Sequence, residues 1–411
     1  MKIAIISSGF LPVVDGVTVT QLYRLQKLSE YGHQVILFCP DYSSLATVYP
    51  NWKDYTGQIY SGVKIINLPS TPFAGLDFER NVSQSSYKIV LDELEKFRPD
   101  VIHIDEPERL WLGFFKVPSI DYAKRIGTPC ISFFHTNFVE YLEDYLPLPF
   151  PLISGLQFIM KRHRRSIYNS YDATLVSSRV TADQLVKTGV KNIRYGQFLG
   201  IDQKGFSAVV KDLNFFENKY NLSGLSKKTK LIFLGRLTPD KNWTFTLDAL
   251  SKFAENIDFD KLALIIAGDG ELKEEISTKL NQLTPNVYFL GRIHPNDIPE
   301  LLVNSDIHVT TSEKETTGLT VLEAFAAGIP VIAPRAGGFI DNVKNNETGF
   351  LYNRGDAEDF VKKLNLLIEN KALREEMAKK SKESVIDFSW EKAVKNLLKV
   401  WEGEITKKLN K

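Results

Sequence analysis

The chain has 411 residues, with 51 Lys and Arg against 50 Asp and Glu, a hydrophobic content of 43% and 2 cysteines. This length exceeds what one compact core can use and favours two domains, while the composition excludes disordered, collagen-like and fibrous proteins. A formal net charge of +1 supplies no overall field that would attract a polyanion, so we expect no nucleic acid among its partners.

Metal binding and secretion find little support in the sequence. Cys39 and Cys130 lie far apart and the six histidines lack zinc-type spacing, so we expect two buried thiols and no metal site. The N-terminal apolar run has no small-residue cleavage site, and no stretch reaches the roughly 18 apolar residues that a membrane span needs. These features predict a cytoplasmic protein.

Apolar runs rich in β-branched residues alternate with helical segments along the chain. Because the runs are continuous rather than alternating, they are typical of strands buried on both faces of parallel sheets. They comprise 2–8, 34–40, 63–69, 100–106, 129–135 and 173–178, followed by 230–237, 262–270, 286–293, 307–312 and 330–336. The pattern builds up a sheet twice and therefore predicts an α/β protein with two doubly wound domains.

The domain boundary is expected within 203–230, where apolar periodicity fades and polar residues cluster. We therefore divide the chain into an N-terminal domain, 1–205, a C-terminal domain, 206–387, and a terminal helix, 388–411. The helix has apolar residues at helical spacing, namely Trp390, Ala393, Leu397, Leu398 and Trp401. It packs either on its own domain or back on the N-terminal domain.

Ligands of open parallel sheets bind beyond the carboxyl ends of the strands, so the loops after strands are the first candidates. The strongest lies in 312–338, where Glu315 precedes a helix that begins at Thr317–Leu319 and has Glu323 about one turn inside it. The helix start offers N–H groups to a phosphate, Gly318 allows close approach, and a ribose diol would satisfy Glu323. Alternatively, both carboxylates merely stabilise a helix N-terminus.

A second strand exit, 234–242, carries cations. Gly235 permits a tight turn, and Arg236 and Lys241 together suit a diphosphate, although such residues are often simply solvated. The glycine-rich exit at 267–270, which contains Gly268, would lie near the same ligand.

These motifs together resemble those of the retaining glycosyltransferases of family 4. The resemblance rests on Glu315 and Glu323 with seven residues between them, on G-R-x4-K at 235–241 and on AGDGEL at 267–272. It runs over nearly the whole chain, including LPVVDGV at 11–17 and FSWEKAV at 388–394. It implies the GT-B fold: two Rossmann-like domains facing across a cleft, with the C-terminal helix bracing the N-terminal domain.

The resemblance also implies roles for individual residues in donor binding. Arg236 and Lys241 would hold the diphosphate, Glu323 the ribose, and Glu315 with the amides of Thr317, Gly318 and Leu319 the sugar and phosphate. Arg292 and Ile293 would line the base pocket, Gly16 would approach the diphosphate, and His135 matches the family's histidine near the donor sugar. A lone histidine at a strand end is otherwise often structural.

The same resemblance implies front-face substitution, in which the leaving phosphate takes the acceptor's proton. Arg236 and Lys241 then replace a metal, so we expect neither a metal nor another cofactor. We interpret the Asp-Phe-Asp at 258–260 as surface charge. Asp105 and Glu106 stand where many relatives have small or uncharged residues, and would contact either the acceptor or unusual donor hydroxyls. His103 is a weaker candidate of the same kind as His135.

Within the family, 312–338 and 132–142 look most similar to enzymes that glycosylate membrane lipids, such as sulfoquinovosyl-diacylglycerol synthase and diacylglycerol glucosyltransferases, with mannosyltransferases close behind. In 146–168 an apolar face (Leu152, Leu156, Ile159, Met160, Ile167) is followed by Lys161, Arg162, Arg164 and Arg165. This segment is either an interfacial helix on an anionic membrane or a core helix with a solvated basic end.

We therefore expect a UDP-favouring hexosyltransferase that acts on a lipid hydroxyl such as that of diacylglycerol, at the inner face of the membrane. The alternatives are a soluble or lipid-linked saccharide acceptor, a sugar-nucleotide epimerase and a non-catalytic sensor. A phosphorylase would need a pyridoxal lysine, and an NAD-dependent enzyme a G-x-G-x-x-G after a strand; neither motif is present.

Overall fold

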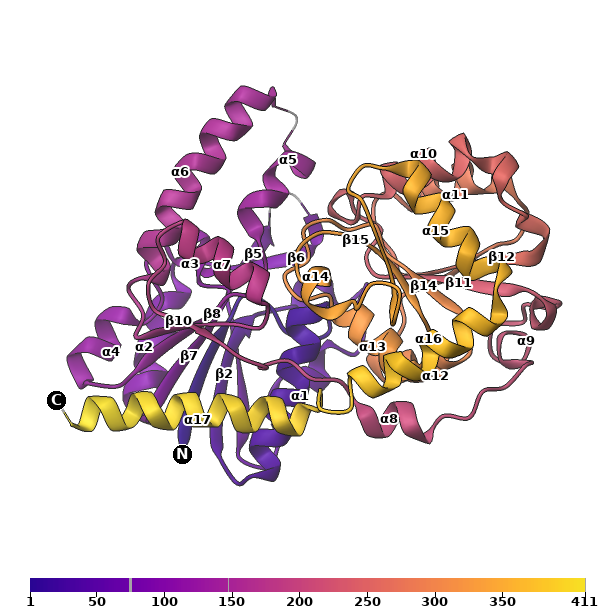
Figure 1. Ribbon diagram of the computed structural model, residues 1–411. Coiled ribbons are helices and arrows are strands. Elements are labelled where there is room, and N and C mark those ends of the chain that lie inside the picture. The colour runs from indigo at the N-terminus through magenta and orange to yellow at the C-terminus, as the bar shows by residue number, and fades with distance from the viewer. Residues whose placement is uncertain (74–75, 147, 411) are drawn as a thin grey trace. The chain divides into compact units, whose positions relative to one another are not determined.

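The computed structural model describes residues 1–73, 76–146 and 148–410 (Figure 1). The chain forms two compact units. Unit 1 comprises Met1–Glu143, Leu148–Gly200 and Trp390–Lys411, and unit 2 comprises Ile201–Ser389 with a short segment that starts at Asp144.

Unit 1 is built on an eight-stranded sheet in the order β10-β9-β8-β7-β1-β2-β4-β3, parallel except for the edge pair β3 and β4. The strands are β1 (Lys2–Ser7), β2 (Gln34–Pro40), β3 (Gly57–Tyr60), β4 (Val63–Leu68), β7 (Val101–Asp105), β8 (Cys130–Phe133), β9 (Ala173–Val176) and β10 (Ile193–Tyr195). A separate antiparallel hairpin joins β5 (Ser70–Phe73) and β6 (Leu76–Val82).

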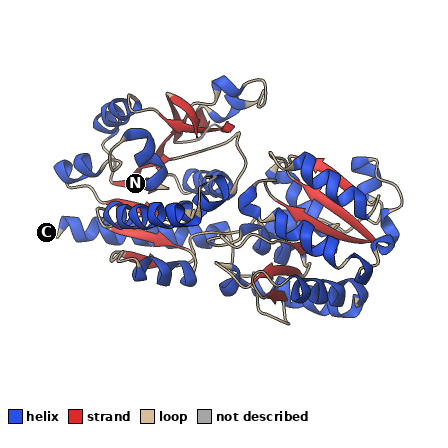
Figure 2. Ribbon diagram, turned by 90° about the horizontal axis from the view of Figure 1, so that it is seen from above, coloured by secondary structure: helices blue, strands red, loops and turns tan. Residues whose placement is uncertain are grey.

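Helices cover both faces of this sheet, and each face has its own apolar core (Figure 2). The helices of this unit are α1 (Gly16–Glu30), α2 (Ser86–Phe97), α3 (Pro107–Phe114), α4 (Ile120–Ile126), α6 (Phe150–Tyr168), α7 (Arg179–Lys187) and α17 (Trp390–Leu409). A short helix, α5 (Leu142–Tyr145), lies where the chain passes to unit 2.

The terminal helix α17 packs beside α1, which is the second of the two placements that the sequence leaves open (Figure 1). The ring of Trp390 stacks on Tyr23 with centroids 5.1 Å apart. Trp401 has no solvent exposure and lies in the same core as β1, β7 and β8. The chain's last residues therefore complete a core that its first residues begin.

Unit 2 contains a six-stranded parallel sheet in the order β13-β12-β11-β14-β15-β16. Its strands are β11 (Thr229–Leu234), β12 (Leu262–Ala267), β13 (Val287–Gly291), β14 (Ile307–Val309), β15 (Val331–Pro334) and β16 (Gly349–Tyr352). The helices are α8 (Gln203–Ala208), α9 (Phe215–Tyr220), α10 (Trp243–Lys252), α11 (Lys273–Leu283), α12 (Ile298–Val303), α13 (Leu319–Ala327), α14 (Phe339–Asn342), α15 (Ala357–Glu369) and α16 (Lys371–Ser384).

Each apolar run identified in the sequence contains a strand, so the prediction of two parallel-sheet α/β domains is confirmed. The sequence analysis missed β3, β10, β16 and the β5–β6 hairpin. These strands lie at sheet edges or outside the main sheets, and most of them are short and lack a continuous apolar run. Among the described residues, no helix has both the length and the apolarity to cross a membrane.

Candidate functional site

In unit 2, two glycine-rich loops meet at the carboxyl ends of neighbouring strands. Leu234 pairs with Ala267 at the ends of β11 and β12, so Gly235 and Gly268 emerge side by side. Gly268 has a φ of +156°, and a Cβ there would lie 1.8 Å from the carbonyl oxygen of Gly235. The backbones can approach this closely only because position 268 has no side chain.

The cations predicted to bind a diphosphate lie at this edge and are held by carboxylates. Lys241 Nζ lies 2.6 Å from Glu315 Oε1 and 3.4 Å from Asp240 Oδ2, while Arg236 lies 3.8 Å from Asp240 Oδ2. The structure thus brings together Arg236, Lys241 and Glu315, which lie in two loops far apart in sequence. These contacts orient both cations.

Asp240 is a site residue that the sequence analysis missed, although it directly precedes Lys241. It is 2% exposed. Burial alone would raise the pKa of its carboxyl, but Lys241 and Arg236 outweigh this and hold the pKa well below its usual range. The ionised carboxylate of Asp240 therefore fixes the two cations. Its position directly before Lys241 is the signal in the sequence that could have revealed Asp240.

Tyr145 is a second missed residue, and nothing in the sequence connects it with this site. Its hydroxyl donates a hydrogen bond of 2.6 Å to Asp240 Oδ1. Burial and the nearby Asp240 raise the pKa of Tyr145, so the phenol stays neutral and remains a donor. Lys314 binds the neighbouring Asp144, so this segment is attached to the site loops at two points.

The N-terminus of α13 is shaped by glycines, as the sequence suggests. Gly318 is the N-cap with a φ of +77°, and a Cβ there would lie 2.4 Å from the Phe339 ring. It provides no side-chain cap, so the first N–H groups of the helix have no capping oxygen from this position. The Thr317 carbonyl accepts a hydrogen bond of 2.6 Å from Asn342 Nδ2, which anchors the loop before Leu319.

Glu323 follows one turn into α13 and makes no hydrogen bond or ion pair with the described residues. The residue keeps some solvent exposure, but protein surrounds its carboxyl group. Burial raises the pKa of Glu323 to about 8. An unpartnered carboxyl at this position is costly for the protein alone, and a donor supplied by a ligand would reduce that cost.

The residues predicted to line a base pocket lie after the edge strand β13. Arg292 Nε is 3.4 Å from Asp269 Oδ2 in the loop after β12, and both side chains are partly exposed. Ile293 packs partly buried against the core of unit 2. The ion pair holds Arg292 beside the loop that contains Gly268.

In unit 1, Gly16 begins α1 directly after a tight cap. Asp15 accepts hydrogen bonds from the N–H groups of Val17 and Thr18, at 2.9 and 2.8 Å. A Cβ added to Gly16 would have no atom within 4 Å. The space at Gly16 agrees with close approach by a ligand, but Asp15 already caps the first turn.

His135 follows β8 and is bound to Asp105 at the end of β7. Its Nε2 lies 2.6 Å from Asp105 Oδ1, and its ring stacks on Phe133 with centroids 3.9 Å apart. Asp105 is fully buried, which argues against the direct acceptor contact considered from the sequence. Glu106 is 9% exposed, adopts a φ of +53° and accepts a hydrogen bond from the Ser8 hydroxyl.

The basic segment of α6 differs in part from the expectation. Arg164 is buried, and its Nε donates to Glu108 at 2.9 Å, so the prediction that it contacts lipid is wrong. Lys161 pairs with Glu140 at 2.7 Å, whereas Arg162 and Arg165 are exposed. Arg164 is buried because the C-terminal end of α6 packs against the rest of unit 1, and Glu108 on α3 compensates its charge.

The exposed apolar face of α6 matches the predicted one only in part. Ile167 is buried, and Leu156 and Met160 are half-buried. Leu152 (60%) and Ile159 (65%) of the predicted face are exposed, and so are Phe150 (75%) and Phe158 (71%), which the prediction did not include. Figure 1 shows most of this helix standing clear of the sheet of unit 1.

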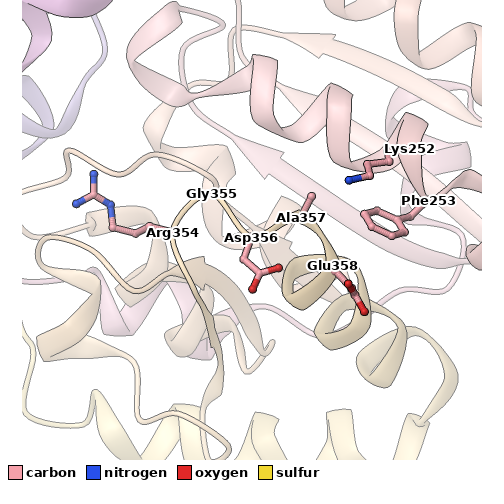
Figure 3. A pocket seen from close by; sticks show the side chains of 7 residues that line it. All are labelled: Lys252, Phe253, Arg354, Gly355, Asp356, Ala357 and Glu358. Atoms are coloured by element: carbon pink, nitrogen blue, oxygen red, sulfur yellow. The ribbon is translucent and has the colours of Figure 1, made fainter.

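A surface pocket of unit 2, with a volume of about 380 Å³, lies elsewhere on the chain from these residues (Figure 3). Its lining includes Lys252, Arg354, Asp356 and Glu358 and none of the predicted site residues. Asp356 caps α15 by accepting from the N–H of Asp359, and Arg354 binds Glu313. Charges of both signs in this pocket are thus already engaged in part, and it is separate from the predicted site.

Metal ligands are not grouped within the described parts of the chain: no cluster of three or more His, Cys, Asp or Glu side chains is positioned to bind an ion. Asp258, from the Asp-Phe-Asp sequence, pairs with exposed Lys261 at 2.7 Å. Asp258 therefore takes part in an ion pair at the surface.

Two family models match the chain, one after the other. A model described as Glycosyltransferase Family 4 matches residues 14–195, within unit 1. A model described as Glycosyl transferases group 1 matches residues 216–384, within unit 2.

Characterised relatives cover most of the chain at moderate identity. Sulfoquinovosyl transferase SQD2 of Arabidopsis thaliana is 30% identical over 310 residues, which are 74% of this chain but only 56% of that protein. A GDP-mannose-dependent alpha-mannosyltransferase of Mycobacterium tuberculosis is 27% identical, with 87% and 85% covered. Alpha-monoglucosyldiacylglycerol synthase of Streptococcus pneumoniae is 25% identical, with 81% and 71% covered.

Among solved structures, Anabaena HepE in complex with UDP and glucose matches with a TM-score of 0.73 at 17% identity, covering 98% of this chain and 100% of that one. This likeness concerns the fold. With the paired parallel sheets, it shows that the chain has the GT-B fold. The two domain matches identify the chain as a glycosyltransferase that carries a Glycosyltransferase Family 4 domain followed by a group 1 domain.

Proposed function

We propose that the protein transfers a hexose from a nucleoside diphosphate sugar to an acceptor hydroxyl, with retention at the anomeric carbon. The observation that carries this proposal is the grouping of Arg236, Lys241 and Glu315 beside the glycine-shaped loops of unit 2. The grouping combines a guanidinium, an ammonium and close backbone approach, which is what a diphosphate requires.

In the proposed reaction the bond between the anomeric carbon and the diphosphate oxygen breaks while the acceptor oxygen bonds to the same face of that carbon. The acceptor proton passes to the departing phosphate oxygen, so the products are the glycoside and the nucleoside diphosphate. Arg236 and Lys241 stabilise the charge that grows on the diphosphate, because they are already oriented toward Asp240 and Glu315. These two cations supply the charge that a metal ion would otherwise provide.

Glu323 receives the ribose in this proposal. Its carboxyl group is unpartnered within unit 2, and a ribose diol would supply two hydrogen-bond donors to it. His135 and Glu106 of unit 1 serve the sugar and acceptor side, since both follow strands at the carboxyl edge of that sheet.

A lipid hydroxyl is the acceptor that we propose, with α6 as the part of unit 1 that docks on an anionic membrane surface. Exposed aromatic and aliphatic side chains on α6 are followed by exposed Arg162 and Arg165, which is the combination needed for interfacial binding. The streptococcal relative, an alpha-monoglucosyldiacylglycerol synthase, supports a lipid acceptor.

The nucleotide of the donor, UDP or GDP, is a separate part of the proposal. UDP occurs in the HepE complex, whereas the mycobacterial relative is named for GDP-mannose, so both nucleotide classes belong in the test. We favour UDP, because the solved HepE structure that shares the fold of this chain binds it.

The test is turnover of UDP- and GDP-sugars, measured as release of nucleoside diphosphate with and without anionic vesicles that contain diacylglycerol. Release that depends on one nucleotide class and on the lipid supports the full proposal. Release that responds to soluble saccharides but not to lipid keeps the transferase and replaces its acceptor. Interconversion of sugar nucleotides without transfer would establish an epimerase, and no turnover with any donor would contradict the proposed activity.

A further inference from the structure

Asp105 is the centre of a buried hydrogen-bond network in unit 1. Its Oδ2 accepts from Arg24 Nη1 at 2.8 Å, and its Oδ1 lies 2.6 Å from His135 Nε2 and 3.2 Å from His103 Nε2. Arg24 and Asp105 are 1% and 0% exposed. The three partners come from three different elements, α1, β7 and the loop after β8.

The register of the sheet explains why these residues meet. Asp105 pairs with Ser7 of β1 on one side and with Phe133 of β8 on the other. His135 follows Phe133 by two residues, so it emerges beside Asp105. Arg24 reaches the same point from α1, which covers this face of the sheet.

The charge of Asp105 determines which nitrogen of His135 bears hydrogen. Burial alone would raise the pKa of Asp105, but Arg24 and the two histidines outweigh it and hold that pKa well below its usual range. An ionised carboxylate has no hydrogen to donate. His135 Nε2 must therefore be the donor, and its neutral ring must be the tautomer with hydrogen on Nε2.

The ring plane of His135 is fixed by a second contact. Phe133 stacks against it at 3.9 Å with an interplanar angle of 30°, and the Arg24 guanidinium lies 5.6 Å from the centroid of the same Phe133 ring. Arg24 thus acts on both supports of His135, the carboxylate and the aromatic ring. One hydrogen bond and one stacking contact leave the imidazole little freedom to rotate.

We propose that Asp105, held by Arg24, is a positioning residue that sets the tautomer and orientation of His135 for the sugar-transfer step. The inference rests on the proposed function, in which His135 serves the donor sugar. Asp105 and Arg24 touch no substrate themselves. Their effect on the reaction passes through the imidazole.

The test uses the whole protein with 15N-labelled histidine, whose nitrogen NMR shifts distinguish the two neutral tautomers. A His135→Gln variant assigns the His135 signals. In the wild-type protein, at a pH where His135 is neutral, we expect hydrogen on Nε2. Hydrogen on Nδ1 would overturn the proposal without any measurement of activity.

The informative variant is Asp105→Asn. Arg24 can only donate, so the carbonyl oxygen of the new side-chain amide should turn toward Arg24 and its NH2 group toward His135. Nε2 of His135 must then accept, and the ring should change to the tautomer with hydrogen on Nδ1. We expect kcat to fall by about 100- to 10,000-fold with a much smaller change in KM.

Asp121→Asn on α4 is the matched control, because Asp121 is an exposed carboxylate of the same unit. It should leave both the His135 tautomer and kcat unchanged. A tautomer change in Asp105→Asn with wild-type kcat would overturn the role in the reaction, and an unchanged tautomer would overturn the network itself. If Asp105→Asn does not fold, the wild-type tautomer remains the deciding measurement. Absence of transferase activity in the wild-type chain would contradict the proposed function and leave the NMR test intact.

Discussion

At the scale of single residues, the site depends on charged groups that hold one another in place. Lys241 lies between Asp240 and Glu315, and Asp240 in turn holds Arg236. Such preorganised cations stabilise charge that develops during a reaction without having to reorient. Glu323 differs, because its carboxyl has no partner among the described residues.

Replacing Lys241 with Ala should reduce kcat by about 100- to 1,000-fold, since one of two diphosphate cations is lost. The fold should survive, because Asp240 keeps Arg236 and Tyr145. The measurements are steady-state turnover and the melting temperature. Lys261→Ala, at an exposed lysine of the same unit, is the control and should behave as wild type. Wild-type turnover in Lys241→Ala would remove Lys241 from the diphosphate site.

Glu323 should make the stability of the protein depend on pH. Its folded-state pKa of about 8 lies above the ordinary 4.5, so the folded protein retains a proton that the unfolded chain has lost. The contribution of Glu323 to stability is therefore complete below about pH 4.5 and is lost progressively as the pH rises to about 8, by an amount of the order of a few kcal/mol.

The variant Glu323→Gln cannot ionise and should remove this dependence. We expect its free energy of unfolding, relative to wild type, to be higher at pH 8 than at pH 5, as measured by urea denaturation at the two pH values. Glu358→Gln, at the first turn of another helix of unit 2, is a suitable control. An identical difference at both pH values would mean that Glu323 already finds a partner in solution.

At the scale of elements, α6 shows how a helix can serve two surroundings along its length. Arg164 and Ile167 near its C-terminus are buried, whereas Phe158 and Ile159 in its middle are exposed. The basic cluster recognised in the sequence is thus divided by the fold, because only Arg162 and Arg165 remain exposed.

Neutralising Arg162 and Arg165 together, as Arg162→Gln and Arg165→Gln, should weaken binding to anionic vesicles. Each arginine near such a surface contributes about 1 kcal/mol, so the double variant should bind about 30-fold more weakly in a sedimentation assay. A Phe158→Ser and Ile159→Ser pair should also lose binding, including binding to neutral vesicles. Val186→Ser on α7 replaces an exposed apolar residue of the same unit and should have no effect. Unchanged vesicle binding in both double variants would contradict membrane docking through α6.

At the scale of the whole chain, the most distant connection is the return of α17 to unit 1. Trp390 stacks on Tyr23, and Trp401 lies beside His103 with ring centroids 5.4 Å apart. The last residues of the chain therefore cover the sheet face on which Asp105 and Arg24 lie. A helix with two buried tryptophans contributes to the stability of unit 1 rather than of the unit that precedes it in sequence.

Trp401→Ala should lower the free energy of unfolding of unit 1 by about 3–5 kcal/mol, because it removes a large and fully buried side chain. Chemical denaturation followed by circular dichroism measures the effect, because this signal does not rely on the tryptophan that the variant removes. Leu409→Ala, at a residue that is 81% exposed near the end of the same helix, should change stability little. Equal stability of the two variants would show that α17 is dispensable for the core.

The sequence by itself determined the two parallel-sheet domains, because continuous β-branched runs separated by helices leave few other arrangements. It also identified glycines and charged residues that follow several of the strands, since those patterns are local. Only the tertiary structure decided that Asp240 holds the cations and Tyr145 binds Asp240, that Asp105 is buried against Arg24 and His135, and that Arg164 is buried against Glu108. These outcomes depend on contacts between residues far apart in the chain, where burial changes a charged side chain from a surface group into a structural one.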